Sequence, residues 1–81
     1  MNGQVYRKYL QQYVNDAVRN SDGSNRGISE YLETLPQAGK FTRRRDEKNR
    51  AREDALSAFR DHRQWPVDIT ISHLGIQLDR E

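Results

Sequence analysis

The residues of this sequence most suited to chemistry lie in an arginine-rich segment near its middle. On a helix predicted over residues 42–62, Arg44, Lys48 and Arg52 recur every four residues and form a basic stripe on one face. No acid lies three or four residues from Lys48, and like-charge neighbours cost a helix roughly 0.2–0.5 kcal/mol each. An anionic partner would offset that cost, since guanidinium groups bind phosphate oxygens through charge-assisted hydrogen bonds. The predicted binding residues are Arg43, Arg44, Arg45, Lys48 and Arg52.

A second interpretation is that these charges only form a solvated surface. On another face of the same helix, Asp46, Arg50 and Asp54 recur at the spacing at which opposite charges pair, so that face carries no functional claim. The arginines of the basic stripe could likewise pair with acids on another helix or in the C-terminal segment 66–81, which has three acids and one base. Both interpretations stay open at this point.

The segment that begins Thr42-Arg43-Arg44-Arg45 resembles the arginine-rich RNA-binding peptides of lambdoid phage antitermination proteins. The resemblance implies that the arginines bind RNA. It covers only residues 42–54, and this chain departs from the pattern by placing acids where such peptides are mostly basic. It therefore indicates a kind of binding and does not identify a family. The departing residues are Asp46, Glu47, Glu53 and Asp54.

Other residue types argue against catalysis and metal binding. The chain has no cysteine, which excludes disulfides, thiolate catalysis and the usual structural zinc sites. Its two histidines, His62 and His73, have no carboxylate cluster at a ligand-like spacing. No serine lies in a nucleophile elbow, and no glycine pattern suits a phosphate-binding loop. We therefore predict a protein that is not an enzyme and that has no metal and no cofactor.

Three helices are predicted to position the basic stripe, and the first begins near Asn2 or Gly3 and ends near Arg19 or Asn20. Its apolar residues recur at three- and four-residue steps. Its three tyrosines are therefore interpreted as core residues with hydroxyls at the rim, rather than as a platform for stacking bases. An exposed loop is predicted at residues 20–27. The apolar arc consists of Tyr6, Tyr9, Leu10, Tyr13, Val14, Ala17 and Val18.

The second helix is predicted to begin with Ser29 as its cap and to end at Leu35, before Pro36. Residues 37–40 then lead to the third and longest helix, with Thr42 as its cap. An arc of mostly small residues in the C-terminal half of that helix is expected to pack on the first helix. The N-terminal half then projects its basic side chains past the core. The packing arc consists of Ala51, Ala55, Ala58, Phe59 and His62.

The end of the chain is predicted to form a β-hairpin over residues 66–81. Pro66 ends the third helix, and Trp65 before it is interpreted as a core residue. Gly75 suits the left-handed position of a short hairpin turn. A hairpin alone is marginal, so it must pack on the helices, and its free edges remain open to another chain. The predicted fold class is α+β. The residues that alternate with polar neighbours are Val67, Ile69, Ile71 and His73 in one strand and Ile76 and Leu78 in the other.

Length and composition predict one small domain over residues 1–81. A chain of 81 residues with 33% hydrophobic and 32% charged side chains buries a small core, so a second chain, as in a homodimer, would help it. The net charge of +2 is too small to indicate nucleic-acid binding by itself, and the excess of bases is local to residues 41–65. No long apolar run suggests a membrane span, and the first residues do not resemble a signal peptide. These features predict a cytoplasmic protein.

Two functions fit these patterns. The first is a small regulatory protein that binds nucleic acid, DNA or RNA, through the basic stripe and its flanking arginines. The second is a protein-binding inhibitor or adaptor of the kind found in phages and mobile elements. It would use the basic face or the hairpin edge against an acidic partner protein. The second function accounts better for the near-neutral net charge.

Overall fold

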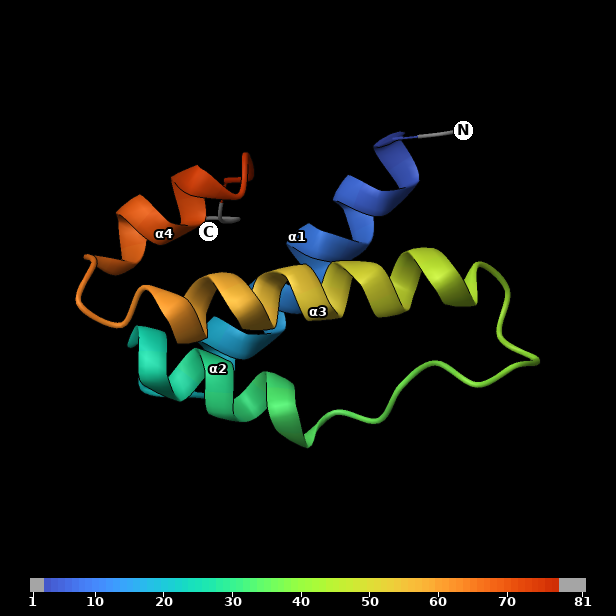
Figure 1. The fold of residues 1–81 in the computed structure, drawn as a ribbon, viewed down its shortest axis with the longest axis horizontal. Coiled ribbons are helices and arrows are strands. Elements are labelled where there is room, and N and C mark those ends of the chain that lie inside the picture. The colour runs from blue at the N-terminus through green and yellow to red at the C-terminus, as the bar shows by residue number, and fades with distance from the viewer. Residues whose placement is uncertain (1–2, 78–81) are drawn as a thin grey trace.

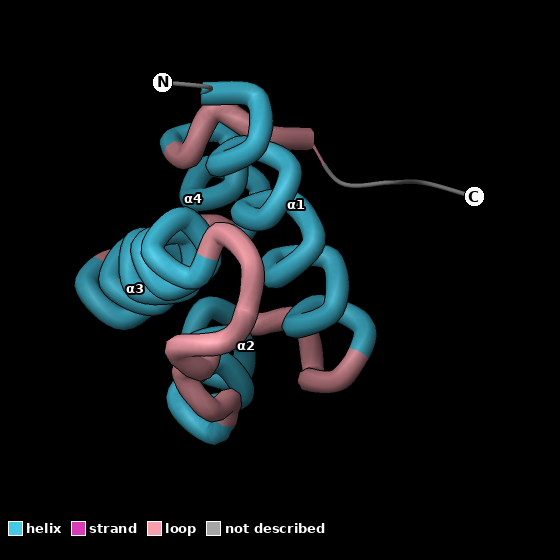
Figure 2. The backbone as a smooth tube through the Cα atoms, turned by 90° about the vertical axis from the view of Figure 1, so that its right-hand side faces the viewer, coloured by secondary structure: helices cyan, strands magenta, loops and turns pink. Residues whose placement is uncertain are grey.

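The computed structural model describes residues 3–77, and all the regular secondary structure within them is helical, with no strand. Its helices are α1 (Gly3–Arg19), α2 (Asn25–Thr34), α3 (Arg45–Asp61) and α4 (Val67–His73). The long helix α3 is central, with α1 and α2 packed against it, and the chain turns back after α3 so that α4 lies above its C-terminal half in Figure 1. Figure 2 is viewed almost along the axis of α3 and shows α1 to its right and α2 below it.

The core lies where the apolar faces of α1, α2 and α3 meet. Small residues on α3 let the helices approach closely, and Phe59 fills the space between them with a fully buried ring. Burying such a side chain contributes about 1.5–3 kcal/mol. The residues predicted for these faces of α1 and α3 are confirmed as buried or packed against the core, except His62, which is half-buried and outside it. The buried set includes Leu10, Val14, Ala17, Ile28, Leu32, Ala51, Ala55, Ala58 and Phe59.

Two helix boundaries agree with the prediction, and one does not. Helix α1 ends at Arg19, and its alternative start at Asn2 lies outside the described residues. Leu35 leaves the helical conformation at ψ 137°, as expected before Pro36. Helix α2 begins earlier than predicted, because Ser24 caps it instead of Ser29.

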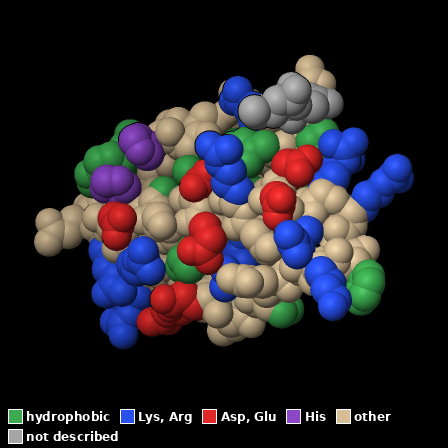
Figure 3. All heavy atoms as spheres, turned by 45° about the vertical axis from the view of Figure 1, so that its right-hand side comes forward, with side chains coloured by type: hydrophobic (Ala, Val, Ile, Leu, Met, Phe, Trp, Pro, Cys, Tyr) green, Lys and Arg blue, Asp and Glu red, His purple; other side chains and the backbone are tan. Residues whose placement is uncertain are grey.

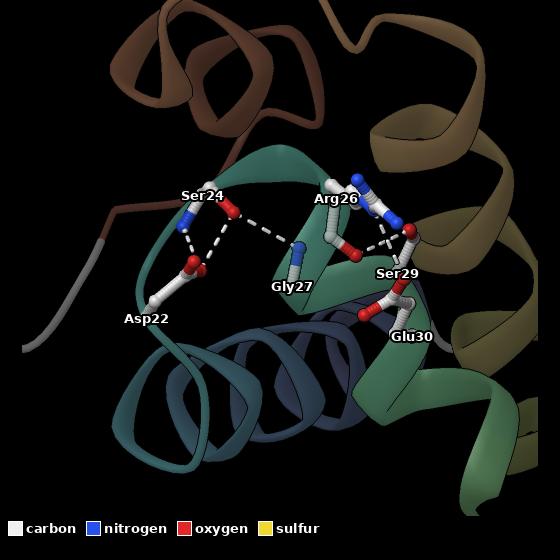
Figure 4. Close-up of polar contacts among 6 residues, drawn as sticks. All are labelled: Asp22, Ser24, Arg26, Gly27, Ser29 and Glu30. Atoms are coloured by element: carbon white, nitrogen blue, oxygen red, sulfur yellow. Dashed lines mark hydrogen bonds and ion pairs between the residues drawn. The ribbon is translucent and has the colours of Figure 1, made fainter.

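The cap of α2 is a short network of hydrogen bonds (Figure 4). The Ser24 hydroxyl accepts a hydrogen bond from the Gly27 amide at 3.0 Å, and Asp22 accepts from both the amide and the hydroxyl of Ser24. These bonds lower the pKa of the Asp22 carboxyl. Ser29 instead donates its hydroxyl to the Arg26 carbonyl, one turn back. The predicted loop is therefore shorter and occupies residues 20–24.

Asn25, at the start of α2, connects this helix to the junction between α3 and α4. Its side chain is 3% exposed, and its amide nitrogen lies 2.6 Å from the carbonyl oxygen of His62 and 2.9 Å from that of Trp65. The hydroxyl of Thr70 on α4 lies 3.1 Å from the same nitrogen. This one side chain therefore fixes the path of the chain between the two helices.

The predicted β-hairpin is wrong, and with it the α+β class, because residues 67–73 form helix α4. The pattern of residues 67–74 fits both the two-residue repeat of a strand and the three- to four-residue repeat of a helix. Its alternating apolar residues fit a strand, but its buried or half-buried side chains recur at three- and four-residue steps, as on a helix. The part of the predicted second strand at residues 78–79 lies outside the described residues. The side chains facing inward are Val67, Thr70, Ile71 and Leu74.

Gly75 adopts the predicted left-handed conformation, but it ends a helix instead of turning a hairpin. Its φ is 75°, and its amide donates to the Ser72 carbonyl at 2.9 Å. Ile76, one residue on, is buried in the same core cluster as Ile71. These features match a glycine-terminated helix end with its accompanying hydrophobic contact.

Candidate nucleic-acid interface

The loop before α3, which contains Lys40, Arg43 and Arg44, lies at one end of the molecule (Figure 1). Helix α3 begins at Arg45, and Arg44 occupies the capping position that was predicted for Thr42. Arg44 adopts a left-handed conformation with φ 60° and makes no side-chain capping bond. This conformation costs a non-glycine residue about 1–2 kcal/mol. Backbone strain of this size is often kept where a functional site needs it.

The three consecutive arginines at this junction are open to solvent. Arg44 lies 3.5 Å from Glu47, and Arg45 lies 3.3 Å from Asp46. Both arginine side chains are nearly half exposed, and ion pairs of this kind contribute only about 0–1 kcal/mol. Arg43 is exposed and has no ion-pair partner within the described part of the chain. All three guanidinium groups can therefore reach an external anion.

The other two predicted binding residues are engaged with the protein itself. The ammonium of Lys48 lies 5.3 Å from the centre of the Tyr9 ring, which is a cation–π contact between α3 and α1. Arg52 is only 7% exposed and donates to Glu53 at 2.5 Å. The predicted binding set thus divides into an exposed group, Arg43, Arg44 and Arg45, and two residues held against the body of the protein.

The tyrosines of α1 face cations and an acid of α3. The Tyr6 hydroxyl donates to the Asp54 carboxylate, and the guanidinium of Arg50 lies 5.5 Å from the Tyr6 ring. Burial, together with the hydrogen bond to Asp54, raises the pKa of Tyr6 to about 12. Burial also raises the pKa of Tyr13, and Arg52 opposes that change. The tyrosines pack against the core, which confirms their predicted role.

The predicted self-neutralising face is present in part. Arg50 lies 3.9 Å from Asp54, as its spacing of four residues predicts. Asp46 pairs with its neighbour Arg45 instead. Arg50 and Asp54 also contact Tyr6 of α1, so this face is only partly open to solvent, and it adds nothing to the candidate site.

Phe41 is the residue of this region that sequence reasoning missed. Its side chain is 93% exposed, and the ammonium of Lys40 lies 5.3 Å from its ring centre. The signal in the sequence is an aromatic residue next to a run of basic residues. Figure 3 shows a hydrophobic side chain beside Lys and Arg side chains at the right edge of the molecule. We define the basic loop patch as Lys40, Phe41, Arg43, Arg44 and Arg45.

A second group of rings lies at the opposite end of α3. His62 and Trp65 stack with ring centroids 3.7 Å apart and planes within 8°, and the His73 ring meets both edge-on at 5.4 Å. Trp65, predicted as a core residue, is instead 38% exposed. The two histidines are brought together, but the described residues contain no cluster of side chains able to hold a metal ion.

None of the helices within residues 3–77 is long and apolar enough to cross a membrane. Comparison of the chain with protein-family models, with curated proteins and with solved structures finds no match.

Proposed function

We propose that this chain is a small, non-enzymatic regulatory protein of the cytoplasm that binds nucleic acid, DNA or RNA, through the basic loop patch. The observation that carries the proposal is Phe41, a ring 93% exposed within a run of basic side chains. An apolar ring in this position adds nothing to the folded core. Its contact area is open to a partner, and the surrounding charges favour an anionic one.

The chemistry of the patch suits a single strand in particular. Arginine guanidinium groups bind phosphates through paired hydrogen bonds, and an exposed ring stacks on an unpaired base. Stacking of one base on an aromatic side chain contributes about 1–3 kcal/mol. Residues 40–48 hold five bases and two acids, so the local charge stays positive although the whole chain is nearly neutral. A paired duplex would offer its phosphates but no open base to Phe41.

The competing class is an acidic protein. It could meet the same arginines, but the sheet-edge route to such a partner has no counterpart within residues 3–77, which contain no strand. Exposed ion pairs to carboxylates contribute little. Nucleic acid is preferred because it supplies both a phosphate for the guanidinium groups and a flat partner for the Phe41 ring.

Fluorescence anisotropy with labelled oligonucleotides of about 12 nucleotides tests the proposal. Three proteins are compared: the wild type, Phe41→Ala, and the double variant Lys40→Glu with Arg43→Glu. These residues are exposed and make no ion pair within the described part of the chain, so their replacement leaves the fold intact. Lys8→Glu with Arg26→Glu is the control, because it makes the same change in net charge on α1 and α2 and removes only one exposed ion pair, between Arg26 and Glu30.

The expected result is that single strands bind the wild type, that Phe41→Ala binds them more weakly, and that the Lys40/Arg43 variant loses most binding. The control variant should stay close to wild type. Absence of binding by the wild type at about 50 mM salt contradicts the proposal, as does an equal loss in the control. A nuclease-treated pull-down that keeps its partner would instead support the protein-binding alternative.

A further inference from the structure

A hollow of about 350 Å³ lies at the C-terminal end of α3, far along the helix from the basic loop patch. It combines the exposed indole of Trp65 with basic side chains. We call it the tryptophan hollow. Its lining residues are Arg60, Asp61, His62, Arg63, Gln64 and Trp65.

The rings of the hollow are held in place by contacts from three helices. Trp65 stacks on His62 at 3.7 Å, and His73 of α4 meets both rings edge-on. The backbone carbonyls of His62 and Trp65 are both hydrogen-bonded by Asn25 of α2. Because these contacts fix the indole, a ligand that uses its exposed part would lose little side-chain entropy on binding.

The charges of the hollow suit one phosphodiester group. Arg60 lies 3.6 Å from Asp61, which offsets its charge. Arg63, two residues beyond the last residue of α3, is exposed and has no ion-pair partner among residues 3–77. The two arginines and one acid leave a single positive charge. A phosphodiester, with one negative charge, matches this balance, whereas the higher charge of a nucleoside triphosphate does not.

We infer that the tryptophan hollow is a second nucleotide-binding site, which takes one unpaired nucleotide of a single strand, with its base on the Trp65 ring and its phosphate at Arg63. This inference rests on the proposed function and deepens it, because the same strand would contact the basic loop patch with another nucleotide. The ligand is then a single strand long enough to reach both sites.

The distance between the two sites sets that length. Helix α3 has 17 residues, which corresponds to about 25 Å at 1.5 Å per residue. In the middle of the face in Figure 3, Asp and Glu side chains lie among Lys and Arg side chains, so opposite charges offset one another there. Phosphates gain little in that region. The strand should therefore be held at its two contact points, and the second contact should add affinity only when the linking nucleotides can span the gap.

Trp65 is the only tryptophan of the chain, so its intrinsic fluorescence reports directly on the hollow. Single strands of about 4 and about 12 nucleotides are titrated into wild type, Arg63→Glu and the control Arg26→Glu. We expect the longer strand to quench Trp65 and to bind at least about tenfold more tightly than the shorter one. Arg63→Glu should abolish both the quenching and the dependence of affinity on length, and Arg26→Glu should keep both.

The outcomes separate the two proposals. If the longer strand binds but leaves Trp65 unquenched, and Arg63→Glu binds as wild type does, the inference is overturned and the proposed function stands. If Arg63→Glu abolishes quenching while Lys40→Glu with Arg43→Glu changes nothing, the hollow is supported and the proposed role of the loop patch falls. If no strand binds, both fall. Equal quenching by a polyglutamate peptide overturns the inference in favour of an acidic protein ligand.

Discussion

The side-chain amide nitrogen of Asn25 lies 2.6 Å from the backbone carbonyl oxygen of His62, 37 positions later in the sequence. The same nitrogen lies 2.9 Å from the carbonyl oxygen of Trp65. Replacing Asn25 by Ala removes its hydrogen bonds to these two part-buried carbonyl groups, of which that of His62 still accepts from the Trp65 amide. The loss should lower the free energy of unfolding by about 1–3 kcal/mol. Asn25→Asp should do the same, because a carboxylate cannot donate to a carbonyl.

Urea denaturation followed by circular dichroism checks this prediction. Asn20→Ala is the control, because Asn20 also donates to a backbone carbonyl, that of Asp16, but at an exposed position. Asn20→Ala should lower the free energy of unfolding much less than Asn25→Ala does. Similar losses at Asn20 and Asn25 would show that the junction between α3 and α4 does not depend on Asn25.

Burial of Tyr6 and its hydrogen bond to Asp54 make the stability of the protein fall as the pH rises through the alkaline range. The pKa of Tyr6 is about 12 in the folded protein against 10.0 for an ordinary tyrosine, because of burial and the Asp54 hydrogen bond. Between these values the unfolded chain loses its proton before the folded protein does. The folded protein then binds more protons, so this contribution to stability is present below pH 10 and is lost as the pH rises toward 12.

Tyr6→Phe tests this dependence, because the variant has no hydroxyl to ionise. The free energy of unfolding should fall less steeply between pH 10 and 12 in Tyr6→Phe than in the wild type. Tyr31→Phe on α2 is the control for the loss of a tyrosine hydroxyl elsewhere in the protein. An unchanged slope in Tyr6→Phe would mean that this hydroxyl does not titrate differently in the folded protein.

Arg44 has a strained backbone conformation and is also a proposed phosphate-binding residue. Its replacement by glycine should therefore relieve strain but weaken binding. Glycine adopts φ 60° without the cost that Arg44 bears. Arg44→Gly should therefore be about 1–2 kcal/mol more stable than the control Arg43→Gly, because both substitutions add a similar entropy to the unfolded chain. Both variants should bind single strands more weakly than wild type, since each removes one cation that can bind a phosphate.

Thermal or urea unfolding of the two glycine variants, with oligonucleotide titrations alongside, provides the measurement. Equal stability of Arg44→Gly and Arg43→Gly would show that the left-handed conformation at Arg44 carries no cost. Wild-type affinity in both would remove these two arginines from the interface.

The helices with one clear period could be predicted from the sequence. In α1, apolar residues fit only a helix, and Gly3–Arg19 matches the predicted bounds. Residues 67–74 could not be assigned in this way, because their apolar positions fit both a strand and a helix. One contact that holds this segment in place, from Asn25 to Thr70, joins residues far apart in the sequence. Local periodicity does not contain that information.

The candidate site was predictable only in part, because some of its features depend on contacts between residues far apart in the sequence. The charges of Arg43, Arg44 and Arg45 follow from the sequence, and so does their place at the start of a helix. The engagement of Lys48 by Tyr9 depends on how α1 crosses α3, and the exposure of Phe41 depends on where the helix begins. The stacking of Trp65 on His62 depends on the turn between α3 and α4.

The salt dependence of single-strand binding tests the central claim most directly. On a single strand, each phosphate that a protein neutralises adds about 0.7 to the steepness with which log K falls against log salt. We predict that Lys40→Glu with Arg43→Glu has a slope shallower than wild type by about 1.4, while Lys8→Glu with Arg26→Glu keeps the wild-type slope. A slope that is the same in all three proteins would contradict the proposal that the basic loop patch binds nucleic acid.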